Sequence, residues 1–291
     1  NFRGKAGEQE SLRVMNMKES WDRFRLLESP LFQPLHPVIS QLVTDRFPVL
    51  QNWNDLLQIS PITNQNGCNI QFVPQGTGQL PFEMQYEPRC YLAGEIQTRS
   101  GNWHDLFNAL VWLTFPRAKS AINACHYSAL AGMTTSAESD GSQRGSVRDT
   151  STLLDESGVV VPYSDQGLAE LLHNFEWHHL FWKRRSEVLQ RMGFYILGHG
   201  LYEKALRPYV GMTGQGLLFR VESGFFDWPI ADRLAHLDIL LADHLNCSGR
   251  YLSTRELSPV PLLGIPGWAP ENESAEYYDN TAYFRPKRRV R

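Results

Sequence analysis

The chain lacks long apolar runs, closely spaced cysteines and an excess of basic residues, and each absence argues against a class of protein. No run approaches the about 18 apolar residues that a membrane span needs, so no membrane association is expected. The four cysteines are scattered, without C-x-x-C or metal-ligand spacing. This is typical of thiols in a reducing compartment and predicts a cytoplasmic protein. The formal net charge of −3 argues against a nucleic-acid partner, because nucleic-acid binders usually carry a basic face.

Familiar catalytic signatures are also absent. The sequence contains no G-x-x-x-x-G-K-[ST], no G-x-G-x-x-G after a strand, no H-E-x-x-H and no G-x-S-x-G. The glycine-rich stretch 211–216 does not follow a convincing buried strand, so it is predicted to be only a turn. Residues 1–20 are polar and lack the hydrophobic region of a signal peptide. They are expected to be a leader that is disordered or was added to the natural chain.

The composition that remains is globular, with 42% hydrophobic and 20% charged residues. Eight Trp, eleven Tyr and fifteen Phe supply the apolar surface for a large core. No clean linker interrupts residues 21–291, which are therefore predicted to form one globular domain. Helical and strand-like segments alternate without a repeat. The predicted class is α+β, a mainly helical single domain with a small antiparallel sheet or hairpins and a long extended C-terminal segment.

The best-marked element is a helix that starts after Asn102. Asn102 can cap it, Asp105 stands three residues later as in a capping box, and an apolar stripe follows up to Phe115. Asp105 is therefore predicted to be a capping carboxylate rather than a site residue. Pro116 suits the first turn of a second helix, predicted over 117–131.

Other segments are assigned from periodicity and turn residues. Residues 150–161 are predicted to form a β-hairpin, in which Asp155 opens the turn and Gly158 closes it. Glu156 beside them is given a structural role for the same reason. Residues 132–147 are small and polar, which is typical of a flexible loop. Helices are further expected over 31–58 with a break at Pro48, over 166–206 with a break near Asn174, and over 229–246, with a strand over 70–73 and an extended tail over 259–286.

His199 and Glu203 are the most informative polar pair. On a helix through 192–206 they share the apolar stripe, and an ionisable pair that faces inward is costly unless it is satisfied. Gly198 and Gly200 flank the histidine and lower helix propensity, which indicates that a ligand or another backbone approaches closely. Two interpretations stay open: the pair belongs to a functional site, or it forms an internal hydrogen bond that orders the core.

A second group of polar residues lies around the capped helix. His104 and Asn108 are one turn apart on one face of it. In the first turn the helix dipole favours a neutral imidazole, which can act as a base or a metal ligand. Arg99 ends a predicted strand just before this helix, and Arg148 and Asp149 follow the flexible loop. An arginine there can clamp a carboxylate or phosphate, although structural ion pairs are the commoner outcome.

Six segments together carry a resemblance to a known family. They are residues 91–99 (YLAGEIQTR), 102–119 (NWHDLFNALVWLTFPRAK), 148–158 (RDTSTLLDESG), 198–203 (GHGLYE), 261–268 (PLLGIPGW) and 278–286 (YDNTAYFRP). In combination they resemble domain of unknown function 3025, a bacterial family, over roughly residues 30–286. The resemblance implies a bacterial, cytoplasmic protein. It carries no activity and no catalytic residues over to this chain.

Two classes of function fit these observations. The first is an enzyme for hydrolysis or group transfer on a small anionic substrate, with His104, Asn108, His199 and Glu203 as catalytic residues and Arg99, Arg148 and Asp149 as substrate-binding residues. A divalent metal held by His199, Glu203 and His104 is compatible with it. The second is a non-catalytic module that binds a small ligand or a protein, in which these residues form a structural network. The enzyme needs them around a cavity that solvent reaches, and it places His104 and His199 on facing helices within about one solvent molecule of each other.

Overall fold

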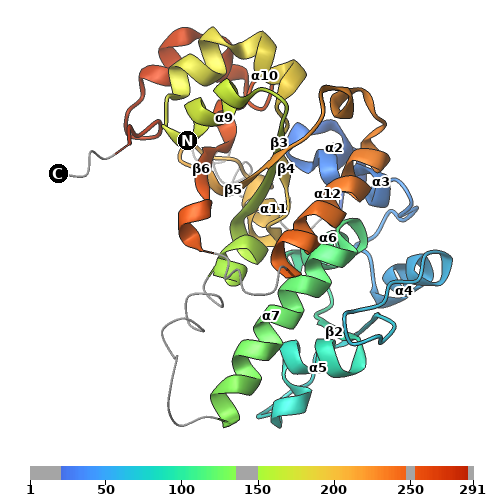
Figure 1. The fold of residues 1–291 in the computed structure, drawn as a ribbon. Coiled ribbons are helices and arrows are strands. Elements are labelled where there is room, and N and C mark those ends of the chain that lie inside the picture. The colour runs from blue at the N-terminus through green and yellow to red at the C-terminus, as the bar shows by residue number, and fades with distance from the viewer. Residues whose placement is uncertain (1–20, 136–149, 247–252, 288–291) are drawn as a thin grey trace, which may run out of the picture.

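The computed structural model describes residues 21–135, 150–246 and 253–287. At its centre is a four-stranded sheet with the strand order β4-β3-β5-β6, and helices lie to both sides of it (Figure 1). β3 and β5 pair in parallel, whereas β4 and β6 pair antiparallel at the two edges. The predicted α+β class is confirmed, but this sheet is mixed rather than antiparallel. Its strands are β3 (Gly158–Tyr163), β4 (Tyr195–Ile196), β5 (Thr213–Arg220) and β6 (Ser258–Pro261).

The strand β3 is buried from its first residue through Pro162. Its run of three valines is typical of a strand that is covered on both faces. Residues 150–157 before it are helical, so the predicted hairpin over 150–161 is wrong. Gly158 does not close a turn. It lies where the helical segment passes directly into β3, and a side chain there would clash with the helix. A Cβ at Gly158 would lie 2.4 Å from the carbonyl oxygen of Leu154.

The strand β5 overturns the predicted turn at 211–216. Gly214 and Gly216 lie inside this strand. A Cβ on Gly214 would meet Val159 of β3 at 2.4 Å, and one on Gly216 would meet Val260 of β6 at 2.7 Å. Glycine is needed at both positions because neighbouring side chains pack directly over the strand.

A smaller parallel pair, β1 (Gln71–Pro74) and β2 (Glu95–Thr98), lies beside the helix α5 (Tyr86–Ala93). The predicted strand over 70–73 is confirmed. The next helix, α6 (Trp103–Thr114), begins as predicted, because the Asn102 side chain accepts a hydrogen bond of 3.0 Å from the Asp105 N–H. Pro116 then opens α7 (Pro116–Thr135), which extends beyond the predicted end at residue 131.

The helix α12 (Ile230–Asn246) packs along α7 (Figure 1). Its buried Asp238 accepts hydrogen bonds from the backbone N–H groups of Arg117 at 3.1 Å and Ala118 at 2.8 Å. These groups have no partner inside α7 itself, since the first turn of a helix leaves its N–H groups unpaired. A side chain of one helix therefore caps the other. The predicted helix over 229–246 is confirmed.

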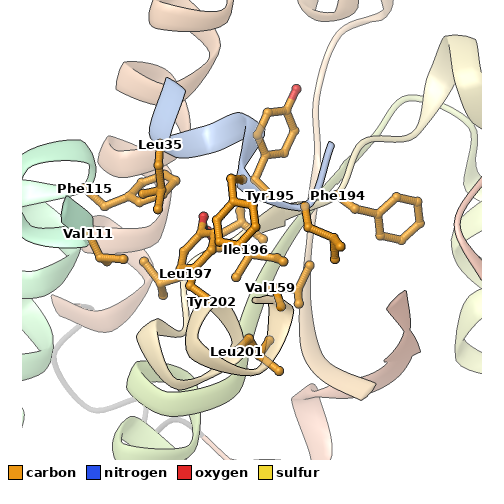
Figure 2. Packing of buried hydrophobic residues seen from close by; sticks show 14 of the residues in the cluster. Leu35, Val111, Phe115, Val159, Phe194, Tyr195, Ile196, Leu197, Leu201 and Tyr202 are labelled. Atoms are coloured by element: carbon orange, nitrogen blue, oxygen red, sulfur yellow. The ribbon is translucent and has the colours of Figure 1, made fainter. Parts of the chain in front are cut away.

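The region 166–206 is helical in pieces. The helices α9 (Gln166–His173), α10 (Arg185–Arg191) and α11 (His199–Ala205) are separated by a π-helical turn at His179–Lys183 and by β4. The predicted break near Asn174 is confirmed. A helix running through 192–206 is wrong in its first half, because residues 195–196 pair with β3. Figure 2 shows why this exchange is favourable: Ile196, Leu197 and Tyr202 pack together with Leu35, Val111 and Phe115 in the core.

Residues 258–284 pack onto this core. The tail begins with β6 and continues in short 3-10 helices, and its side chains at Leu262, Ile265, Tyr278 and Phe284 are buried. Residues 132–135 of the predicted flexible loop belong to the end of α7, so the loop prediction is wrong there; residues 136–147 lie outside the described residues, as does the leader 1–20. The remaining helices are α2 (Arg23–Glu28), α3 (His36–Ile39) and α4 (Leu50–Ile59), with 3-10 helices at Pro30–Leu35, Phe82–Met84, Ser223–Asp227, Thr254–Glu256, Leu262–Gly264, Pro270–Glu273 and Ala275–Asp279.

Candidate functional site

The site is built where α11 packs against α6. His104 is the second residue of α6, and His199 is the first residue of α11. Their Nε2 atoms are 2.9 Å apart, and their rings meet edge-to-face at 71°. The predicted placement of these two histidines on facing helices, within reach of one another, is confirmed.

Glu156 is the third member of the site. Its Oε1 atom lies 3.5 Å from His199 Nε2 and 3.8 Å from His104 Nε2. The two glycines beside His199 make this approach possible. A Cβ at Gly198 would lie 2.4 Å from the backbone nitrogen of Ser157, and one at Gly200 would lie 2.4 Å from Glu156 Oε2. The close backbone approach that the glycines predict is therefore that of residues 156–157.

His104, Glu156 and His199 together can hold a metal ion, since one ligand atom from each lies within 4.8 Å of the others. The two Nε2 atoms and Glu156 Oε1 are separated by 2.9, 3.5 and 3.8 Å. The point in their plane that is equidistant from all three lies about 2.0 Å from each atom, which matches the Zn–N and Zn–O distances of protein sites. The expected ligand set contained Glu203 in the place of Glu156. Glu203 instead lies behind His104, where its Oε2 atom is 3.2 Å from Nδ1.

Both histidines thus have a carboxylate behind them. His199 Nδ1 lies 3.7 Å from Asp155 Oδ2, and the buried Lys119 binds the other oxygen of that carboxylate. Burial would raise the pKa of Asp155, but Lys119 and then His199 outweigh it and lower the pKa to about 2. Burial also lowers the pKa of His199 to about 4 against the opposing charge of Asp155. At neutral pH a neutral imidazole therefore lies beside an ionised carboxylate. At 3.7 Å the two atoms form no hydrogen bond, and His199 Nδ1 is buried without a hydrogen-bond partner among the described residues.

The three residues open onto a cavity of about 640 Å³. His104 and Glu156 keep 33% and 43% of their side chains exposed, so solvent reaches the site. The cavity also collects two other predicted site residues, Arg99 and Asn108. Its lining consists of Gln75, Gly78, Gln79, Leu80, Gln85, Tyr86, Glu87, Gln97, Arg99, His104, Asp105, Asn108, Asp155, Glu156 and His199.

Residues 70–288 match a protein family described as a protein of unknown function, DUF3025. The chain belongs to this family. His104, Glu156 and His199 all fall within the matched residues, whereas α2, α3 and α4 precede them. Neither a curated protein nor a solved structure matches the chain. Within the described part of this DUF3025 protein, no helix is long and apolar enough to cross a membrane.

The predicted substrate-binding residues have a different outcome in this DUF3025 structure. Arg99 is bound to Asp105 through its backbone N–H at 2.7 Å, its Nε at 2.9 Å and a terminal guanidinium nitrogen at 2.8 Å. The carboxylate of Asp105 therefore pairs with Arg99 rather than capping α6, because β2 ends just beside the first turn of that helix. Arg148 and Asp149 lie outside the described residues.

Sequence reasoning missed three residues of the site: Asp155, Glu156 and Lys119. The adjacent acidic pair was visible, but a turn at 155–158 explained it without a site. A helical assignment for 150–157 would have placed both carboxylates on the last turn before a buried strand. Lys119 has no comparable signal, because nothing local distinguishes it from a solvated lysine.

Proposed function

We propose that the protein is a hydrolase that binds a divalent metal ion through His104, Glu156 and His199. The observation that carries this proposal is the orientation of the two imidazoles. Each Nδ1 faces a carboxylate, which favours a proton on that nitrogen. Both Nε2 atoms then turn lone pairs toward each other across 2.9 Å and toward Glu156. Three acceptors at this spacing would repel one another without a cation between them, and this supports a metal ion at the centre of the three residues.

The ligand set supports hydrolysis. Two histidines and one glutamate, with further positions left open, are the ligands of several catalytic zinc sites. A metal ion in such a site lowers the pKa of a bound water to about 7 and supplies a nucleophile at neutral pH. The exposed sides of His104 and Glu156 face the cavity, so the open positions are accessible to water and to a substrate. The same accessibility favours this function over a closed structural network.

Calorimetric titration of the metal-stripped full chain with Zn²⁺ tests the proposal. We expect one ion per chain. His104→Gln and Glu156→Gln should each weaken binding by more than about 100-fold, since outer partners alone contribute 10- to 100-fold. His179→Gln is the matched control, because His179 is half-exposed and pairs with Glu176 away from the cavity. Wild-type affinity in both site variants would overturn the proposal, as would a wild type that binds no ion.

A further inference from the structure

The hydroxyl of Tyr86 is placed to contact a substrate. Tyr86 lines the cavity, and its oxygen accepts a hydrogen bond of 2.7 Å from Asn108 Nδ2. In this orientation of the amide the Tyr86 hydroxyl accepts from Asn108 and keeps its own hydrogen, while Asn108 Oδ1 is buried without a hydrogen-bond partner among the described residues. Burial raises the pKa of Tyr86 well above its usual value. At neutral pH the side chain is therefore an uncharged donor with an unused hydrogen.

Tyr86 and the three residues of the candidate metal centre line the same cavity. His104 and Asn108 are one turn apart on the same face of α6, which separates their Cβ atoms by about 5–6 Å. Asn108 thus holds the hydroxyl of Tyr86 about one helical turn from His104. A substrate in this cavity can therefore meet both the metal centre and the tyrosine.

The charges of the lining indicate what kind of group fits. Arg99 is already bound to Asp105, and Lys119 binds Asp155 from behind the cavity. Of the two lining carboxylates that remain, Glu87 is bound by His126 and Asn123, and Glu156 is a ligand of the proposed ion. A divalent ion would balance the charge of both. Among the described lining residues no cation is then left over for a phosphate or another multiply charged anion. The expectation of a small anionic substrate consequently has little support from this charge balance.

We infer that the substrate is an uncharged carbonyl compound, and that Tyr86 donates a hydrogen bond to its carbonyl oxygen. The inference rests on the proposed metal-dependent hydrolysis.

The oxygen of the attacking water bonds to the carbonyl carbon, and the π electrons move to the oxygen that accepts the hydrogen bond from Tyr86. The bond from carbon to the leaving group then breaks, and the leaving group takes the proton that the water released. The products are a carboxylic acid and an alcohol or amine. The hydrogen bond strengthens as the oxygen gains charge, which lowers the barrier.

The test uses the full chain loaded with Co²⁺, whose visible absorption reports the ligands of the ion. Acetohydroxamate, a small carbonyl chelator, is titrated into wild type, Tyr86→Phe and Tyr91→Phe. Tyr91 lies on the same helix but stacks on Tyr127 outside the cavity, so it is a matched control. We expect acetohydroxamate to bind about tenfold more weakly to Tyr86→Phe, the effect of one hydrogen bond to a charged oxygen. Tyr91→Phe should match wild type.

Each outcome decides one question. Equal acetohydroxamate affinity in all three proteins overturns the role of Tyr86 and leaves the metal site intact. Tighter binding of inorganic phosphate than of acetohydroxamate to wild type overturns the uncharged substrate class. A wild type without a Co²⁺ spectrum overturns the proposed function itself. If Tyr86→Phe fails to fold, Asn108→Leu takes its place, because it removes the amide that holds the hydroxyl; unchanged acetohydroxamate affinity in that variant contradicts the inference.

Discussion

His104 and His199 are 95 residues apart in the sequence, and their Nε2 atoms are 2.9 Å apart in the structure. Their other ring nitrogens face Glu203 and Asp155. Glu203 orients the His104 ring through a contact of 3.2 Å, whereas burial fixes the His199 ring, so both are oriented before any ligand arrives. Such a preorganised site binds a metal ion more tightly, because little free energy is lost in ordering the ligand side chains.

Gly200→Ala should weaken metal binding without unfolding the protein. The new Cβ would lie 2.4 Å from Glu156 Oε2, so the carboxylate must leave its present position beside the two histidines. We expect Zn²⁺ affinity to fall about tenfold, while alanine in a helix offsets some of the strain by up to about 1 kcal/mol. Gly224→Ala is the control, because a Cβ there meets nothing within 4 Å. Equal calorimetric affinities in the two variants would contradict the positioning role of Gly200.

Glu203→Gln and His199→Ala distinguish a functional site from a structural network. A network that loses one partner leaves the other unpaired. The cost is about 1–3 kcal/mol where the groups are buried, as around His199, and smaller between the partly exposed His104 and Glu203. We expect instead that thermal melts of both metal-free variants match or exceed wild type, since site residues are commonly held at a cost in stability. Glu203→Gln should also reduce Zn²⁺ affinity about tenfold, as loss of an outer carboxylate does. A clear loss of stability in both variants, together with no metal bound by wild type, would end the enzyme hypothesis.

Lys119→Met should be strongly destabilising. Lys119 is 3% exposed and binds Asp155, whose carboxylate would then be buried without its cation. We expect the free energy of unfolding to fall by about 3 kcal/mol in urea denaturation. Lys119→Met combined with Asp155→Asn should recover most of that loss, because no buried charge remains unpaired. If the double variant is no more stable than the single one, packing rather than charge explains the effect.

Asp238 should make stability depend on pH between about 4 and 6. Burial raises its pKa to about 6, against the two backbone N–H groups that donate to it. The folded protein then holds one more proton than the unfolded chain between the unfolded pKa of about 3.9 and the folded value. The contribution of Asp238 to stability is therefore greatest below this window, decreases as the pH rises through it, and is level above it. A shift of about two pKa units corresponds to about 3 kcal/mol.

Urea denaturation of wild type and Asp238→Asn across this pH range isolates that contribution, because the other groups titrate in both proteins. We expect the stability difference between the two to change by up to about 3 kcal/mol in the direction just given. A difference that is flat, or that grows in favour of wild type as the pH rises, would mean that the two hydrogen bonds outweigh burial.

The sequence by itself determined the features that depend on neighbouring residues. Asn102 and the stripe after it mark the start of α6 because a cap and a helical period are local. Gly198 and Gly200 indicate a close approach because glycine in a helix is unfavourable without a reason. These signals placed His104 and His199 in one site.

Only the tertiary structure decided what approaches those glycines. The pairing of β3 with β5 joins segments more than 50 residues apart, and no local pattern specifies such a partner. Gly214 and Gly216 therefore resembled a turn, although they lie beneath the valines of neighbouring strands. Glu156 was missed for the same reason. Its helical segment resembles a turn in the sequence, because the pairing of the strand that follows it cannot be predicted locally. A carboxylate becomes a ligand through the position of its backbone, and that position is set by packing across the whole sheet.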